Sequence, residues 1–192
     1  MQTLVLASTS IYRKELLARL GLPFITAAPE VDETPLPGET PPHLVRRLAE
    51  LKARAVTARY AGALIIGSDQ VAVIDGQILG KPGNHERAVA QLRLASGKRL
   101  DFLTGLCLLN AATGQAQVDI VYFGVAFRRL SEQQIENYLR HEQPYHCAGS
   151  FKSEALGIAL CERFEGEDPS ALIGLPLIRL IRMLEQENVS VI

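Results

Sequence analysis

The chain begins with an apolar segment that leads directly into a helical pattern, and this junction constrains the fold more than any other stretch. Residues 3–7 are predicted to form a strand and residues 11–20 a helix. Ser10 can cap that helix, because its hydroxyl can accept a hydrogen bond from an N–H group of the first turn. Such a helix start exposes unpaired N–H groups and the positive end of the helix dipole. Ser8, Ser10 and Arg13 therefore form a candidate phosphate-binding turn, although an ordinary capped helix gives the same pattern.

Strand-like and helix-like segments alternate along the rest of the chain. Further helices are expected over residues 42–60, 85–95, 131–140 and 170–187, and further strands over residues 63–66, 71–74, 77–79, 100–109, 117–127 and 157–163. Residues 28–42 are rich in proline and acids and are expected to form a loop. Because hairpins occur beside the strand–helix alternation, we expect an α/β fold with a mixed sheet.

Composition excludes several classes of protein. Apolar residues make up 47% and charged residues 21% of the 192-residue chain, which is enough for a folded core. The formal net charge of -1 gives no general attraction to nucleic acid or to a membrane surface. No apolar run is long enough to span a bilayer. We therefore expect neither nucleic acid nor a membrane as a partner.

The cysteines and histidines show no metal-binding or disulfide pattern. Cys107, Cys147 and Cys161 are odd in number and widely spaced, and no CxxC pair occurs. The four histidines also lack the spacing of metal ligands. These features favour a reducing cytoplasm over an oxidising compartment.

Lys52 interrupts the apolar face of a predicted helix. The apolar positions are Val45, Leu48, Ala49 and Val56, and a period of 3.6 residues places Lys52 among them. A lysine that faces inward needs a partner or a polar cavity, because an unpaired buried charge is very costly. The alternative is a buried stem whose amine reaches water.

Residues 67–70, Gly-Ser-Asp-Gln, follow the apolar run 63–66 directly. Asp69 is therefore expected at the end of a buried strand, where open α/β sheets bind their ligands. A carboxylate there can hold Mg²⁺ or accept a proton from water. The alternative is an aspartate that forms a turn beside a glycine.

Two further segments supply charge that suits the same chemistry. Lys81 follows Gly80, where the backbone can approach a ligand closely, and Glu33 lies in an acidic loop. Taken alone, Lys81 and Glu33 could each equally be an ordinary charged residue on the protein surface. Together, Arg13, Lys52 and Lys81 suit an oligophosphate, while Glu33 and Asp69 suit a divalent cation and an attacking water. No Walker-A, GxGxxG or kinase pattern is present.

These residues belong to short motifs through which the chain resembles the Maf-type nucleoside triphosphate pyrophosphatases. The motifs, in order, are Ala7-Ser8-Thr9-Ser10 with Arg13, Val31-Asp32-Glu33-Thr34, Lys52-Ala53, Gly67-Ser68-Asp69-Gln70, Gly80-Lys81-Pro82, Ala148-Gly149-Ser150-Phe151 and Ile173-Gly174-Leu175-Pro176. The resemblance covers almost the whole chain and implies a single domain over residues 1–192. It implies an elongated α/β fold, similar to inosine triphosphatases, with helices flanking a mixed sheet and two lobes around a central cleft.

The resemblance also implies an activity and a site. The family members are cytoplasmic enzymes that cleave a nucleoside triphosphate between the α and β phosphates with a divalent cation, here Mg²⁺ or Mn²⁺. Asp69 is implied as the proton acceptor and, with Glu33, as a metal ligand. A small-molecule nucleotide is the implied partner, and a homodimer is the expected assembly. The residues implied to bind the substrate are Ser8, Ser10, Arg13, Lys52 and Lys81.

Tyr12, Gln70 and Glu154 indicate the branch of the family that acts on 7-methyl-GTP and clears modified nucleotides. The branch that acts on dTTP and UTP carries Arg, Thr and Gln at these positions, whereas the 7-methyl-GTP branch carries an aromatic residue, most often Trp, then Gln and Glu. Tyr12 can stack on the positively charged base, and Glu154 can accept hydrogen bonds from guanine N–H groups. Gln70 can donate to a carbonyl oxygen of the base or orient Asp69.

Two alternatives remain at this stage. One is a dTTP/UTP pyrophosphatase, against which the three specificity positions argue. The other is a non-catalytic nucleotide-binding regulator of cell division. The presence of Asp69 and Glu33 beside cationic residues argues against the regulator, because binding alone needs no general base.

Overall fold

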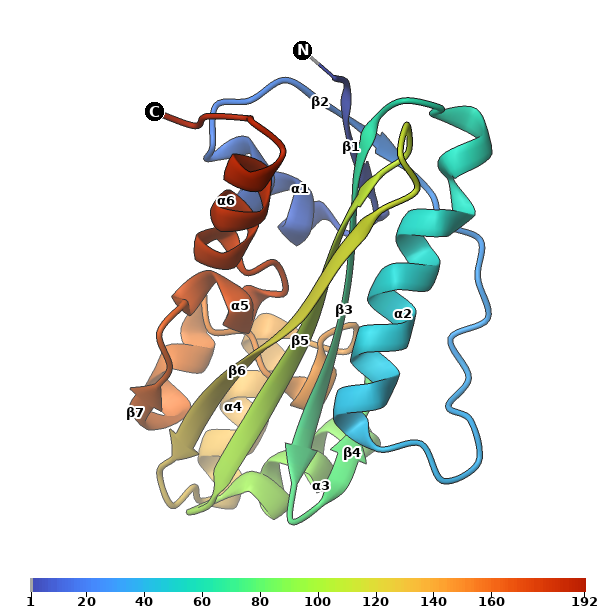
Figure 1. The fold of residues 1–192 in the computed structure, drawn as a ribbon. Helices are drawn as coiled ribbons and strands as arrows, with labels where there is room; N and C mark the ends of the chain where they lie inside the picture. The colour runs from blue at the N-terminus through green and yellow to red at the C-terminus, as the bar shows by residue number, and fades with distance from the viewer. Residues whose placement is uncertain (1) are drawn as a thin grey trace. The chain divides into compact units, whose positions relative to one another are not determined.

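A mixed seven-stranded sheet forms the centre of the computed structural model, which describes residues 2–192 (Figure 1). The strand order is β2-β1-β3-β5-β6-β7, and β4 pairs with β3. Strand β1 is parallel to β2 and β3, whereas β4 and β7 are antiparallel to β3 and β6. The prediction of an α/β fold with a mixed sheet is confirmed.

The elements alternate along the chain as the sequence pattern predicts. The strands are β1 (Leu4–Ala7), β2 (Phe24–Ala27), β3 (Leu64–Ile74), β4 (Gln77–Leu79), β5 (Arg99–Asn110), β6 (Ala116–Phe127) and β7 (Cys161–Glu165). The helices are α1 (Ile11–Ala18), α2 (Pro41–Ala55), α3 (His85–Ala95), α4 (Glu132–Glu142), α5 (Pro169–Ile173) and α6 (Leu177–Gln186), with short 3-10 turns η1 (Thr57–Arg59), η2 (Ala148–Ser150) and η3 (Leu156–Leu160). Within residues 2–192, no helix combines the length and the apolar character needed to cross a membrane.

The chain divides into two compact units. Unit 1 comprises Met1–Asp69, Thr104–Val121 and Asp168–Ile192, and unit 2 comprises Gln70–Leu103 and Tyr122–Glu167. Strands β3, β5 and β6 supply residues to both units. Each unit is described by itself below.

The core of unit 1 has two layers because successive side chains of a strand point to opposite faces. Leu4 and Leu6 of β1 belong to an apolar cluster with residues of α1 and α6. Val5 and Ala7 belong to a second cluster that includes residues of α2. Figure 1 shows α2 on one side of β1 and β3, and α1 and α6 on the other. This parallel part of the sheet is thus covered on both faces, as is usual for parallel strands.

Two glycines let α2 lie very close to the sheet. A Cβ atom at Gly67 of β3 would lie 2.0 Å from the carbonyl oxygen of Ala49, and one at Gly105 of β5 would lie 2.1 Å from that of Val45. Neither position has room for any side chain. The absence of a side chain at both positions brings the buried face of α2, which includes Lys52, directly against β3.

Unit 2 is built from a hairpin and two capped helices. The hairpin of β3 and β4 turns at Asp75 and Gly76, which both have positive φ, as a two-residue type I′ turn requires. The side chain of Asn84 accepts a hydrogen bond from the first turn of α3. Ser131 and Gln134 form a reciprocal capping box at the start of α4. The hairpin predicted from residues 71–74 and 77–79 is confirmed, and each of these features depends on a few adjacent residues.

The strand predicted at residues 63–66 is wrong in its end point. Strand β3 continues through Gly67 and Asp69 to Ile74, so Asp69 lies within the strand and not at its end. Gly67 resembles a strand terminator in sequence, but its lack of a side chain serves the close approach of α2. Asp69 nevertheless lies beyond the parallel pairing of β1 with β3, which extends only from Leu64 to Ile66 on β3.

Other elements also differ from the prediction. The helix expected over residues 42–60 ends at Ala55 and is followed by the turn η1. Strand β2 was not predicted, since its four residues leave little pattern. Residues 156–160 form the turn η3, and the strand expected over residues 157–163 begins only at Cys161. The helix expected over residues 170–187 is broken at Gly174, whose φ of 117° ends α5. A positive φ at a glycine is a common helix terminator.

We predict that Gly67→Ala destabilises the protein by about 1–3 kcal/mol or more, because the new methyl group meets backbone that cannot move independently. Urea unfolding followed by circular dichroism measures the change. Gly80→Ala is the control, since nothing lies within 4 Å of a Cβ there and its φ is not positive. Equal stability of the two variants would contradict the close packing of α2.

Candidate active site

A buried lysine bound to two carboxylates lies at the centre of the candidate site in unit 1. The Nζ atom of Lys52 lies 2.7 Å from Oδ1 of Asp69 and 2.8 Å from Oε1 of Glu33. The side chains of Lys52 and Asp69 are 6% and 9% exposed, whereas that of Glu33 is 55% exposed. The prediction that Lys52 faces inward and needs a partner is confirmed, and its amine does not simply reach water.

The local fold explains why these groups meet. Lys52 comes from the apolar face of α2, which Gly67 holds against β3, and Asp69 follows two residues later on that strand. Burial of both charges costs desolvation energy that their mutual attraction offsets only in part. One ammonium group faces two carboxylates, and the guanidinium of Arg13 supplies a second positive charge near them. The pair therefore adds little net stability, which makes this position a candidate for a functional site.

The turn between β1 and α1 has the geometry expected of a capped helix. The Ser10 hydroxyl accepts a hydrogen bond from the backbone N–H of Arg13 at 3.4 Å, and the Ser8 hydroxyl accepts one from that of Ser10 at 3.1 Å. Ser8 is buried, and Ser10 is partly exposed. The structure therefore brings the two hydroxyls and the first turn of α1 together, as predicted.

The Arg13 side chain is fixed by a backbone carbonyl. Its Nε atom donates to the oxygen of Gly174 at 2.8 Å, and the hydroxyl of Ser68 lies 3.0 Å from the same oxygen. Desolvation lowers the pKa of Arg13, whereas the negative charges of Asp69 and Glu33 oppose that shift. A guanidinium stays charged in proteins, so Arg13 adds a second cation near the carboxylates.

The Arg13 contact gives the motif at residues 173–176 a role that its sequence did not indicate. Gly174 terminates α5 with a positive φ and directs its carbonyl oxygen to Arg13. The only available sequence signal is the helix-breaking pair Gly174 and Pro176. That pair indicates a chain break but not the partner of the exposed carbonyl.

The loop that carries Glu33 is held by an ion pair that sequence reasoning missed. Arg47 of α2 donates to both carboxylate oxygens of Glu39, at 2.7 and 2.8 Å, and to the carbonyl oxygen of Thr34 at 3.1 Å. The hydrogen bond from Arg47 is the main cause that lowers the pKa of Glu39 to about 2. Asp32, in the same loop, accepts from the backbone of Thr34 and so closes a local turn. These bonds tie the loop to α2.

The other predicted site residues divide between the units. Tyr12 is a half-buried residue of α1 in unit 1. Gln70, Lys81 and Glu154 belong to unit 2, in β3, in the loop after β4 and in the segment after η2. Lys81 and Glu154 are exposed. The roles assigned to these residues stay predictions.

The carboxylates suit a hard divalent cation that is shared with a ligand. Among residues 2–192, no group of three or more His, Cys, Asp and Glu side chains is arranged to hold a metal ion. Glu33 and Asp69 share one ammonium, so they could supply two oxygen ligands to one cation. Mg²⁺ commonly takes one or two carboxylates and completes its shell with water and phosphate oxygens. The donor set therefore fits Mg²⁺ or Mn²⁺ better than zinc.

We predict that Lys52→Met lowers the free energy of unfolding by about 3–5 kcal/mol, because it leaves the buried Asp69 carboxylate without its partner. Urea titration at neutral pH measures the loss. Lys14→Met, on the exposed side of α1, should change stability by less than about 0.5 kcal/mol. The double variant Lys52→Met/Asp69→Leu should recover much of the loss. A Lys52→Met protein as stable as Lys14→Met would contradict the buried pair.

Comparison with known proteins places the whole chain in one group. A family model described as Maf-like protein matches residues 3–187. A Nitrosococcus oceani protein named 7-methyl-GTP pyrophosphatase is 63% identical over 190 residues, 99% of this chain and 96% of its own. Proteins of the same name from Pseudomonas syringae pv. tomato and Vibrio cholerae are 60% and 59% identical, with 100% and 98% of this chain and 100% and 97% of theirs covered. The Staphylococcus aureus Ham1 protein aligns with a TM-score of 0.47 and 14% identity over 66% of this chain and 72% of its own, a likeness too slight to carry an argument.

Proposed function

Because this chain belongs to the family of Maf-like proteins, we propose that it is a hydrolase that converts 7-methyl-GTP to 7-methyl-GMP and pyrophosphate. The observation that carries the proposal is the buried Lys52–Asp69 pair with Glu33 at its open side. The full-length relatives named for this activity support the substrate. The proposed physiological role is the removal of modified nucleotides.

The reaction adds one water across the bond between the α and β phosphates. Asp69 accepts a proton from the attacking water, since it is buried and its orientation is fixed by Lys52. Lys52, Arg13 and the hydroxyls of the turn before α1 bind and orient the phosphate oxygens. A divalent cation held by Glu33 and Asp69 would neutralise part of the phosphate charge when bound.

Lys81 of unit 2 is the third cation of the proposed phosphate site. It contributes a flexible point charge that suits the terminal phosphates. Base selection is assigned to Tyr12, Gln70 and Glu154. Tyr12 stacks on the cationic base, and Glu154 accepts hydrogen bonds from the guanine N–H groups, which a pyrimidine cannot supply. The proposed setting is the cytoplasm, with Mg²⁺ or Mn²⁺ as cofactor and a homodimer as the assembly.

We predict that Asp69→Asn lowers kcat for 7-methyl-GTP by about 10²–10⁴-fold, because an amide cannot accept the proton. Steady-state assays of pyrophosphate release measure the change. Asp75→Asn is the matched control, since Asp75 lies in the exposed turn between β3 and β4, where its carboxylate pairs with Lys98. Asp75→Asn should retain full activity. An active Asp69→Asn enzyme would exclude Asp69 as the base.

We predict that Glu154→Gln lowers the preference for 7-methyl-GTP over UTP by about 10- to 100-fold. This fold change corresponds to the free energy that one hydrogen bond to a charged group contributes, about 1.5–3 kcal/mol. The ratio of kcat/KM values over 7-methyl-GTP, GTP, UTP and dTTP is the measurement. Glu162→Gln, at an exposed position of β7, is the matched control. Unchanged selectivity would remove Glu154 from the base site, and a wild-type preference for UTP or dTTP would favour the pyrimidine alternative.

A further inference from the structure

The backbone next to Lys81 is held by groups outside the proposed phosphate site. Lys81 lies in the loop between β4 and α3, and the carbonyl oxygen of Gly80 precedes it. That oxygen accepts a hydrogen bond from Nε2 of Gln91 at 3.0 Å and a longer one from the backbone N–H of Gly149 at 3.4 Å. Gln91 comes from α3 and Gly149 from η2. Two elements therefore fix the peptide group from which Lys81 extends.

The amide of Gln91 is itself oriented by a buried hydroxyl. The Ser150 hydroxyl donates to Oε1 of Gln91 at 2.6 Å, which leaves the Nε2 group directed at Gly80. Ser150 is fully buried, and its φ is 57°. Positive φ is uncommon for a residue with a side chain, and such backbone strain is concentrated at functional sites. In this turn the Ser150 hydroxyl lies within hydrogen-bond distance of Gln91, and the Ser150 carbonyl oxygen accepts from the hydroxyl of Tyr138.

The preceding glycine shows that this turn tolerates little change. Gly149 has a φ of 66°, and a Cβ there would lie 2.9 Å from Cδ2 of Leu100 and 3.2 Å from Cβ of Ala72. On the other side of Ser150, Phe151 packs against Phe102 with ring centroids 5.9 Å apart. The core of unit 2 therefore fixes the position of the Ser150 hydroxyl.

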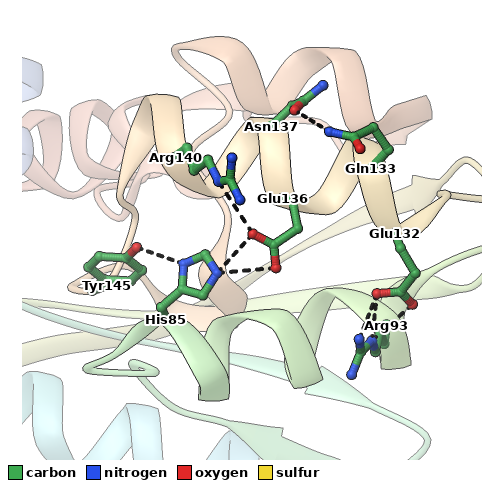
Figure 2. Close-up of polar contacts among 8 residues, drawn as sticks. All are labelled: His85, Arg93, Glu132, Gln133, Glu136, Asn137, Arg140 and Tyr145. Atoms are coloured by element: carbon green, nitrogen blue, oxygen red, sulfur yellow. Dashed lines mark hydrogen bonds and ion pairs between the residues drawn. The ribbon is translucent and has the colours of Figure 1, made fainter.

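The far end of the Lys81 loop is fixed by a polar network between α3 and α4. The backbone N–H of Gly83 donates to the carbonyl oxygen of Tyr145 at 3.0 Å. Figure 2 shows the Tyr145 hydroxyl beside Nδ1 of His85, at 3.1 Å, and Nε2 of His85 directed at the carboxylate of Glu136, also at 3.1 Å. The loop is thus anchored on both sides of Lys81.

We propose that Gln91, oriented by Ser150, is a positioning residue that holds Lys81 in place for the phosphates of the substrate. The inference rests on the proposed function, which assigns Lys81 to phosphate binding. A lysine on a fixed loop loses less freedom when it binds, and a small misplacement of a binding group lowers the rate steeply. The Gln91 side chain thus bridges the segments at residues 80–82 and 148–151.

Two substitutions of Gln91 separate its two hydrogen bonds. Gln91→Met removes both at nearly constant volume. Gln91→Glu keeps an acceptor for Ser150 but cannot donate to Gly80. We predict that each lowers kcat/KM for 7-methyl-GTP by about 10- to 100-fold at a temperature at which the variant is still fully folded, as thermal unfolding followed by circular dichroism verifies. Some loss of stability is expected as well, because Gln91→Met leaves the buried Ser150 hydroxyl without an acceptor. Gln133→Met is the matched control, since Gln133 is exposed on α4, pairs with Asn137 and should give wild-type kinetics.

A double-mutant cycle with Lys81→Met distinguishes positioning from a general structural role. If Gln91 acts through Lys81, adding Gln91→Met to Lys81→Met changes kcat/KM by less than about twofold, because the group to be positioned is gone. An equal fold loss in both backgrounds would overturn the inference, as would wild-type kinetics of Gln91→Met and Gln91→Glu. If Lys81→Met leaves kcat/KM unchanged, Lys81 does not bind the phosphates, and the inference about Gln91 is rejected as well. Failure of the wild-type enzyme to hydrolyse any triphosphate would instead reject the proposed function.

Discussion

The ion pair between Lys52 and Asp69 is the interaction around which the candidate site of unit 1 is built. It forms only because Gly67 and Gly105 allow α2 to lie against the sheet at backbone distance. A buried pair of this kind contributes little net stability, since desolvation cancels most of its Coulomb energy. The ion pair instead holds the Asp69 carboxylate in one orientation, away from bulk water. The loop that carries Glu33 brings a second carboxylate to the same ammonium.

The proposed hydrolysis of a phosphoanhydride depends on charged groups in fixed positions, and this centre contains such groups. Catalysis of phosphoryl transfer depends mainly on positioning and on compensation of charge. Each charged group of the candidate site is held by a backbone carbonyl, a hydrogen bond or an ion pair: Arg13 by Gly174, and Lys52 by Asp69. In unit 2, the loop of Lys81 is fixed in the same manner by Gln91. Fixed charges of this kind lose little freedom when a substrate binds.

Local signals in the sequence predicted local structure well, and contacts across the chain poorly. The Ser10 cap, the hairpin turn at residues 75–76 and the inward orientation of Lys52 follow from neighbouring residues or from helical period, and all are confirmed. The resemblance to the Maf family is confirmed as well. The extension of β3 through Asp69 was missed because Gly67 acts through a contact 18 residues away with Ala49. The bonds of Gly174 and Gln91 were missed for the same reason, since no periodic pattern encodes a side chain that meets a distant carbonyl.

The measurement that tests the central claim most directly is identification of the products formed from 7-methyl-GTP and Mg²⁺ by phosphorus-31 NMR. The account predicts equal amounts of pyrophosphate and nucleoside monophosphate, with no orthophosphate in the initial phase. Release of orthophosphate with a nucleoside diphosphate would contradict the assigned bond cleavage. Unchanged 7-methyl-GTP in the presence of folded protein would contradict the catalytic role of the Lys52–Asp69 centre and favour a nucleotide-binding protein.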